Sequence, residues 1–140
     1  VIRLPIQYLG DALTAEIAER FNKGIERAWS GTFGNYNVTT RVIPYNPAES
    51  GFGNVLRVSS ETRRAHVLGD DLGWISPSDS GAIAAHEAGH FLGLGDQYNK
   101  SGPLPGFEHN IMGVTGGRPS LEDIERIIGD TSGTCVRKCP

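Results

Sequence analysis

The sequence predicts an α+β fold: a twisted sheet, helices packed against it, and an irregular C-terminal lobe with a last helix. The first observation is an alternation of apolar and polar residues at positions 1–8, which is the period of a strand. The second is the recurrence of apolar residues every three or four positions in residues 14–29 and 120–128, which is the period of a helix. The third is a series of short apolar or β-branched runs between them, bounded by turn residues.

The first part of the chain predicts one strand and one helix. The strand at residues 1–8 places its apolar side chains on one face, and Pro5 is tolerable there near an edge or on the outer side. The helix at residues 14–29 has an apolar residue at every fourth position and charged residues over much of its remaining surface. We expect this apolar stripe to pack in the core. Its members are Ile17, Phe21, Ile25 and Trp29.

The middle of the chain predicts several short strands. Residues 30–37 are rich in Gly and Asn, which is typical of a loop. Residues 38–45 are rich in β-branched side chains and predict a strand. Alternating or apolar runs predict further strands at residues 54–59, 65–68 and 72–75. We expect residues 72–75 to form an edge strand beside a cleft.

The C-terminal half predicts two helices separated by an irregular segment. Ser78, Asp79 and Ser80 offer an N-cap for the first of these helices. Residues 99–110 contain several Gly and Pro and predict a surface loop. The last helix fits residues 120–128, where Ser120 and Asp123 suggest a capping box and a glycine follows the apolar pattern.

Residues 82–96, AIAAHEAGHFLGLGD, carry the clearest chemical signal. His86 and His90 are four positions apart, so on a helix they lie on one face and can share one metal ion. Glu87 projects from the adjacent part of that face without being an obvious ligand. The pattern H-E-x-x-H is typical of zinc peptidases, in which the Glu is the general base.

A catalytic zinc usually takes three protein ligands and a water, and Asp96 is the natural third ligand. Gly93 can adopt a left-handed conformation at no steric cost, so a helix ending there would turn and bring Asp96 back to the metal. A bare H-E-x-x-H arises by chance in roughly one chain of this length in a few hundred, and the added Gly and Asp make coincidence much rarer. The alternative is a buried amphipathic helix with two incidental histidines.

Composition and charge limit the class of protein. The chain has 140 residues, of which 38% are hydrophobic and 21% charged, which predicts one globular domain over residues 1–140. The formal net charge of −3 gives no signal for nucleic acid or an anionic membrane as a partner. No apolar run approaches the ~20 residues that a membrane-spanning helix needs.

Two features bear on localisation. The chain begins with Val1, and no charged-then-apolar signal segment opens it, so we expect a mature secreted form or a domain delivered within a larger exported polypeptide. Cys135 and Cys139 are the only cysteines. They either close a small disulfide or stay reduced, and we favour the disulfide of an exported protein.

The motif resembles the signature of the metzincin zinc peptidases, H-E-x-x-H-x-x-G-x-x-[H/D]. The matching residues are His86, Glu87, His90, Gly93 and Asp96. An Asp as third ligand looks most like the small secreted peptidases of the snapalysin type. The resemblance implies a zincin fold with the metal helix across its middle and a Met-turn beneath the metal. Met112, the only Met in the chain, stands at a suitable distance downstream, although a plain core Met would give the same pattern.

The chain departs from better-known metzincins after this Met. Astacin-like and serralysin-like members carry a Tyr two residues later, where this chain has Val114. Tyr98 lies in a segment that resembles the one following the third ligand in snapalysin-type peptidases, and it is the candidate for stabilising the transition state. The alternative role for Tyr98 is to pack its ring beneath Asp96.

Most of the chain is also similar to metallopeptidase domains at the C-termini of RHS-repeat polymorphic toxins of bacteria. The likeness is carried by IQYLGDALTAEIAERFNKGIERAWSGTFGNYNVTTRV and by the EHNIMG stretch. It implies a domain carried by a larger polypeptide, with a cognate immunity or inhibitor protein as a partner.

These features together predict a monomeric zinc endopeptidase that acts on protein or peptide substrates, with Glu87 as general base. The alternative is a non-catalytic zincin module that uses the metal for stability or for binding a partner. The intact Glu87 favours the enzyme, because a structural site gains nothing obvious from it. His66 and His109 are spare histidines, of which His109 is close enough to Met112 to reach the cleft.

Overall fold

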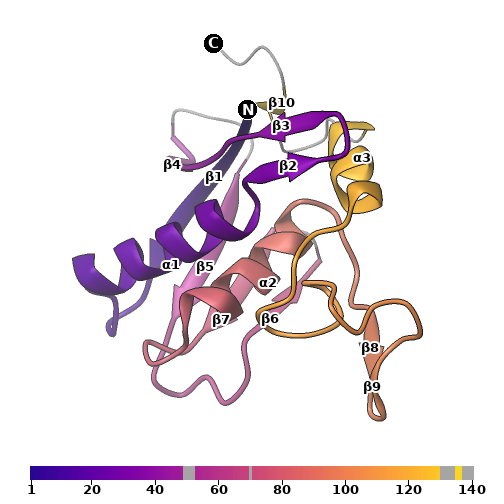
Figure 1. The fold of residues 1–140 in the computed structure, drawn as a ribbon. Coiled ribbons are helices and arrows are strands. Elements are labelled where there is room, and N and C mark those ends of the chain that lie inside the picture. Colours follow the sequence, from indigo (N-terminus) through magenta and orange to yellow (C-terminus); the bar gives the residue numbers. More distant parts are fainter. Residues whose placement is uncertain (49–52, 70, 130–134, 137–140) are drawn as a thin grey trace.

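A computed structural model of the chain describes residues 1–48, 53–69, 71–129 and 135–136 (Figure 1). Within these residues one mixed sheet has six strands: β1 (Ile2–Leu9), β4 (Thr40–Pro44), β5 (Asn54–Val58), β6 (His66–Leu68), β7 (Leu72–Ile75) and β10 (Cys135–Val136). The order of the strands is β10-β1-β5-β7-β6, and β4 pairs with β1. The α+β class expected from the sequence is confirmed.

The first strand lies inside the sheet. β1 pairs in parallel with β4 over Ile2–Ile6 and with β5 over Ile6–Leu9. Pro5 is therefore not at a sheet edge, although its side chain lies on the face turned away from the buried Leu4 and Ile6. The Ile2 amide donates to Thr39, on the side of β4. Backbone amides along a strand point alternately to its two sides, so the nitrogen of Pro5 faces β5. The pairing with β5 begins only at Ile6. The missing N–H of Pro5 therefore removes no bond to β5.

Two helices, α1 (Ala15–Ala28) and α2 (Gly81–Phe91), lie on the same face of this sheet (Figure 1). The side chain of Thr14 caps α1 by accepting the amide of Ile17. The predicted stripe packs against the sheet and α2: Phe21, Ile25 and Trp29 are fully buried and Ile17 is half-buried. The indole Nε1 of Trp29 donates to the carbonyl of Ala85, 2.9 Å away, and so joins the end of α1 to the middle of α2.

The prediction of a loop at residues 30–37 is wrong, because this segment forms an antiparallel hairpin. Its strands are β2 (Gly31–Phe33) and β3 (Tyr36–Val38), which takes Val38 out of the strand predicted at residues 38–45. Gly34 and Asn35 make a two-residue turn, and Gly34 has a φ of 56°. A Gly-Asn pair between short runs with β-forming side chains is a hairpin signal as well as a loop signal.

The prediction that residues 72–75 form an edge strand is wrong. β7 at Leu72–Ile75 lies between β5, to which it is parallel, and β6, to which it is antiparallel. Both sides of β7 are therefore occupied. β6 pairs only with β7 among the described strands, so His66–Leu68 provides the free edge. Local pattern predicts that both segments are strands but carries no information about their order.

The C-terminal lobe is irregular, as expected, and contains a short hairpin and a last helix. The hairpin of β8 (Tyr98–Asn99) and β9 (Gly102–Pro103) occupies part of the predicted loop. The helix α3 (Leu121–Gly129) has the predicted capping box: the amide of Asp123 donates to Ser120 Oγ, and the amide of Ser120 donates to Asp123 Oδ2. The disulfide expected between Cys135 and Cys139 lies outside the described side chains. None of the helices described is long and apolar enough to cross a bilayer.

Candidate metal centre

Both ends of α2 are fixed by local hydrogen bonds. At the start, Ser80 Oγ accepts the amide of Ile83, so Ser80 is the N-cap among the three residues proposed from the sequence. At the end, the amide of Gly93 donates to the carbonyl of His90, and the amide of Leu94 donates to the carbonyl of Gly89. These two bonds form a Schellman motif, which requires a left-handed residue after the helix. Gly93 supplies it with a φ of 91°, as the sequence predicted.

The turn after α2 brings three predicted ligands together. Asp96 Oδ1 lies 3.1 Å from His86 Nε2 and 3.2 Å from His90 Nε2. The three ligand atoms all lie within 4.8 Å of one another, so the group could hold a metal ion. The side chains of His86 and His90 are 10% and 16% exposed, whereas that of Asp96 is 44% exposed. The site therefore has a buried imidazole side and an open carboxylate side.

Two backbone carbonyls orient the imidazoles. His86 Nδ1 lies 2.8 Å from the carbonyl oxygen of Ile111, and His90 Nδ1 lies 2.9 Å from that of Leu94. A carbonyl oxygen can only accept, so each Nδ1 carries the proton. A neutral imidazole then presents the lone pair of Nε2, which is the form that a metal binds. The Schellman turn thus sets both the direction of the chain and, through Leu94, the tautomer of His90.

The three ligand atoms together fit a cation. Two Nε2 lone pairs and a carboxylate oxygen converge on one place, and all three are acceptors when the imidazoles are neutral. The contacts could also be satisfied if both rings were protonated, but two imidazolium groups whose ring centroids are 5.2 Å apart would repel each other beside a single carboxylate. A bound cation attracts all three ligand atoms while both imidazole rings stay neutral, so this repulsion does not arise. Neutral imidazole and carboxylate ligands are those used by zinc and by other divalent transition metals.

Glu87 lies next to this group and is not part of it. Its side chain is buried, and Oε2 has no hydrogen-bond partner among the described residues. Burial raises the pKa of Glu87 to about 8, the negative charge of Asp96 adds to the rise, and Arg64 opposes it. A buried carboxyl group with an unused oxygen is costly for folding alone, which favours a role in chemistry.

Tyr98 reaches the same place from β8. Its ring centroid is 5.9 Å from that of His86, and its hydroxyl accepts a hydrogen bond from Arg64. The guanidinium of Arg64 also lies over the Tyr98 ring, 5.4 Å from its centroid. Burial raises the pKa of Tyr98 and the charge of Asp96 adds to this, so the phenol stays protonated.

Arg64 is the site residue that sequence reasoning missed. It contacts Tyr98 across 34 positions of sequence, and it is the cation that opposes the raised pKa values of Glu87 and Tyr98. The available signal was a pair of arginines, Arg63 and Arg64, directly before a short predicted strand. That strand becomes informative only when it is known to be the edge beside the metal group.

The turn at Met112 supports α2 from below. Met112 is fully buried, and its sulfur packs against Gly89, which lies between the two histidines. Asn110 holds this turn, because its Oδ1 accepts the amide of Met112 and its Nδ2 donates to Asp123 Oδ2 in the cap of α3. The turn therefore places the Ile111 carbonyl against His86, and Met112 itself packs rather than ligates.

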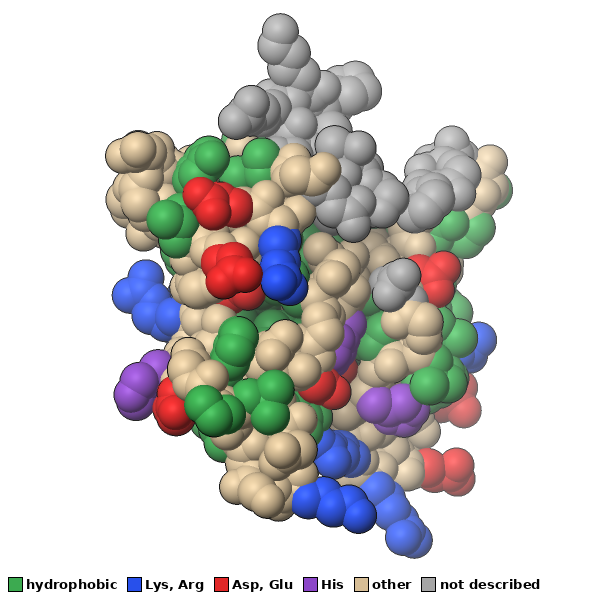
Figure 2. Space-filling model, turned by 90° about the vertical axis from the view of Figure 1, so that its right-hand side faces the viewer, with side chains coloured by type: hydrophobic (Ala, Val, Ile, Leu, Met, Phe, Trp, Pro, Cys, Tyr) green, Lys and Arg blue, Asp and Glu red, His purple; other side chains and the backbone are tan. Residues whose placement is uncertain are grey.

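The metal group opens into a hollow beside the edge strand. One part, of about 390 Å³, is lined by residues of the metal group and of β6, and the adjoining part, of about 430 Å³, reaches Val114 and Thr115. The two parts share Arg64, Ala65, His86, Glu87 and Tyr98. Figure 2 views the face on the side of β8 and β9, where histidine and acidic side chains lie side by side near the middle.

The spare histidines lie outside the metal group. His66 is exposed and stacks on Trp74 with ring centroids 4.9 Å apart, although it lines the same part of the hollow as the metal group. His109 is exposed and does not line either part of the hollow, so the structure does not bring it to the cleft.

The sequence matches no model of a known protein family, and no curated protein is significantly similar to it. The metzincin and toxin-domain resemblances therefore remain hypotheses that rest on the residues quoted above.

Proposed function

We propose that the protein is a zinc-dependent endopeptidase. The observation that supports this is the convergence of His86 Nε2, His90 Nε2 and Asp96 Oδ1, with the buried, unpartnered oxygen of Glu87 beside them. His86, His90 and Asp96 would hold the ion. When bound, zinc supplies Lewis-acid chemistry, polarising a carbonyl group and making water more acidic.

The chain's own residues supply the remaining steps. Glu87 takes a proton from the water that attacks the scissile carbonyl carbon, and it returns that proton to the amine nitrogen as the peptide bond breaks. Burial of Glu87 suits both halves of this task, because it raises the affinity of the carboxylate for a proton. The protonated hydroxyl of Tyr98, held by Arg64, is a donor for the developing oxyanion.

The substrate chain is proposed to bind along β6. This strand offers a free edge, and residues 64–67 line the hollow that contains His86 and Glu87. An extended peptide adds to such an edge through main-chain hydrogen bonds. This mode of binding implies an endopeptidase, since an added strand can continue past both ends of β6.

The test uses Glu87→Ala and Glu87→Gln beside the wild type. Zinc content by elemental analysis should be equal in all three proteins, while cleavage of casein and of a peptide library should be confined to the wild type and stop with a chelator. Equal cleavage by Glu87→Ala would remove Glu87 as the base. Zinc binding without cleavage by the wild type would favour the alternative, a non-catalytic module that binds a partner.

The resemblance to toxin domains suggests where the enzyme acts. We propose delivery by a larger exported polypeptide, with an inhibitor or immunity protein made by the producing cell. Expression of the chain inside bacteria should arrest growth, and expression of Glu87→Ala should not. Normal growth with an active enzyme would favour a free secreted peptidase.

A further inference from the structure

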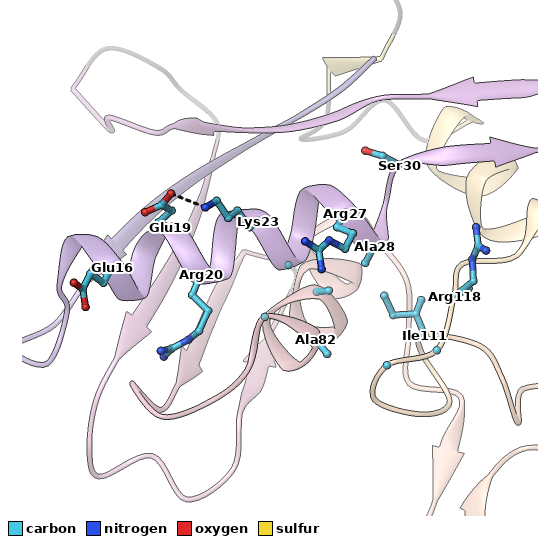
Figure 3. A pocket seen from close by; sticks show the side chains of 15 residues that line it. Glu16, Glu19, Arg20, Lys23, Arg27, Ala28, Ser30, Ala82, Ile111 and Arg118 are labelled. Atoms are coloured by element: carbon cyan, nitrogen blue, oxygen red, sulfur yellow. Dashed lines mark ion pairs between the residues drawn. The ribbon is translucent and has the colours of Figure 1, made fainter.

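A groove separate from the metal centre runs between α1 and α2 and has a volume of about 840 Å³ (Figure 3). None of the three metal ligands lines it, nor does Glu87. Small or apolar residues form its floor: Gly24, Ala28, Gly81, Ala82, Ala85 and Ile111.

The floor is free of large side chains because the two helices meet backbone to backbone. A Cβ atom at position 24 would lie 2.4 Å from the Cα of Gly81, and one at position 81 would lie 2.9 Å from the carbonyl oxygen of Arg20. Glycine is therefore required at both positions of this crossing. Beside the crossing, Ala82 and Ala85 leave room that longer side chains would fill.

The rim of the groove is mainly basic. Figure 3 shows Arg20 and Arg27 pointing from α1 towards the α2 side, while Glu19 and Lys23 lie on the other side of α1. Lys23 is paired with Glu19 at 2.8 Å, and Arg20 donates to the carbonyl of Pro77. The remaining basic residues, Arg27 and Arg118, flank the end of the groove near Ile111.

These two arginines are free to bind a ligand. Both are exposed, and neither side chain makes a hydrogen bond or ion pair with any residue in the described part of the chain. The planar guanidinium group matches a carboxylate with two parallel hydrogen bonds, and it is less strongly hydrated than an ammonium. An apolar floor next to two unpaired guanidinium groups therefore selects for an apolar side chain with carboxylates beside it.

We propose that this groove binds an acidic segment of a partner polypeptide. The line from Glu16 to Arg27 along α1 is about 16 Å at 1.5 Å per residue, which about five residues of extended chain would span. That length and the open shape suit a peptide segment. The charges also determine which end of the segment is acidic. Its carboxylates lie at the end with Arg27 and Arg118, and its neutral or basic residues lie opposite Glu16.

The groove and the metal centre share one loop. Ile111 lines the groove with its side chain, while its carbonyl accepts the Nδ1 proton of His86. The backbone of Ile111 also pairs with that of Arg118 at 3.0 Å. A segment in the groove therefore contacts the loop that orients a metal ligand, but its binding needs neither zinc nor Glu87. The proposal holds whether or not the protein is a peptidase.

A library of random dodecapeptides displayed on phage tests the proposal, with selection on the 140-residue chain carrying Glu87→Ala so that no peptide is cleaved. Enriched peptides should carry Asp or Glu beside an apolar residue. A fluorescein-labelled synthetic copy of the most enriched peptide should bind at least tenfold more weakly to Arg27→Glu/Arg118→Glu, and a copy with Asn and Gln in place of its acids should also bind weakly.

The matched control is Arg57→Glu/Arg126→Glu, which changes the net charge equally at exposed sites outside the groove. It should keep the affinity of the selected peptide. If Arg27→Glu/Arg118→Glu loses its circular dichroism spectrum, the milder Arg27→Gln/Arg118→Gln replaces it. The proposal is overturned by enriched peptides without acids, by unchanged binding to the groove variant, or by an equal loss in the control. Absence of casein cleavage by the wild type would bear on the peptidase proposal alone.

Discussion

The sulfur of Met112 packs directly against Gly89, between the two histidines of α2. A Cβ atom at position 89 would lie 2.3 Å from Met112 Sδ and 3.1 Å from Trp29 Cζ2. Both neighbours are fully buried in the core. Gly89, which stands at an unspecified position of H-E-x-x-H, is thus a packing requirement, and it fixes the distance between α2 and the turn that supports it.

Gly89→Ala should therefore destabilise the protein. Overpacking of a buried site costs about 1–3 kcal/mol, which exceeds the gain of up to about 1 kcal/mol from Ala in a helix. Urea denaturation measures the free energy of unfolding. Gly95→Ala is the control, because its added Cβ would meet no atom within 4 Å beyond the adjacent residues of the chain. Equal stability of the Gly89 and Gly95 variants would show that Met112 is free to shift.

Removal of the Asn110 side chain should loosen the metal site from a distance. Asn110→Ala leaves the buried amide of Met112 without a partner, at about 1–3 kcal/mol, and removes one of the two hydrogen bonds that Asp123 Oδ2 accepts. The Ile111 carbonyl is then less well placed against His86, so zinc affinity should fall by about 10-fold or more. Competition with a fluorescent chelator measures this affinity. Asn37→Ala, at an exposed hairpin position, should leave it unchanged.

Zinc should stabilise the folded protein through Asp96. A ligand that binds only the folded state at 100 times its Kd adds about 2.7 kcal/mol to the free energy of unfolding. Thermal denaturation with zinc and with a chelator should show this difference in the wild type and in Glu87→Ala. Asp96→Asn should abolish it, because the variant keeps the shape of the side chain and removes its charge. A zinc-dependent shift of the same size in Asp96→Asn would exclude Asp96 as a ligand.

Tyr98→Phe should separate the two roles considered for this residue. Loss of one donor to a developing oxyanion lowers kcat by about 100-fold, whereas loss of a packing hydroxyl leaves kcat nearly unchanged. We expect the fall in kcat, with KM and zinc content retained. Steady-state kinetics on one defined peptide measures both constants. Tyr36→Phe, in the hairpin of β2 and β3, is the matched control and should keep full activity.

The sequence alone determined the local geometry of the metal helix. A spacing of four residues puts His86 and His90 on one face, and a glycine three residues later lets the chain turn to Asp96. Each of these steps depends on neighbours within one or two helical turns. For the same reason the caps at Ser80 and Ser120 were predictable, as was the stripe of α1.

Only the tertiary structure decided which distant segments complete the site. The carbonyl that orients His86 comes from Ile111, and the guanidinium beside Glu87 comes from Arg64, which a strand order invisible in local patterns brings to the edge. The same holds for β6 and β7, which are both short and apolar enough to be strands. Hydrophobic periodicity reports which face of an element is buried, whereas the choice of neighbour depends on packing between elements far apart in the chain.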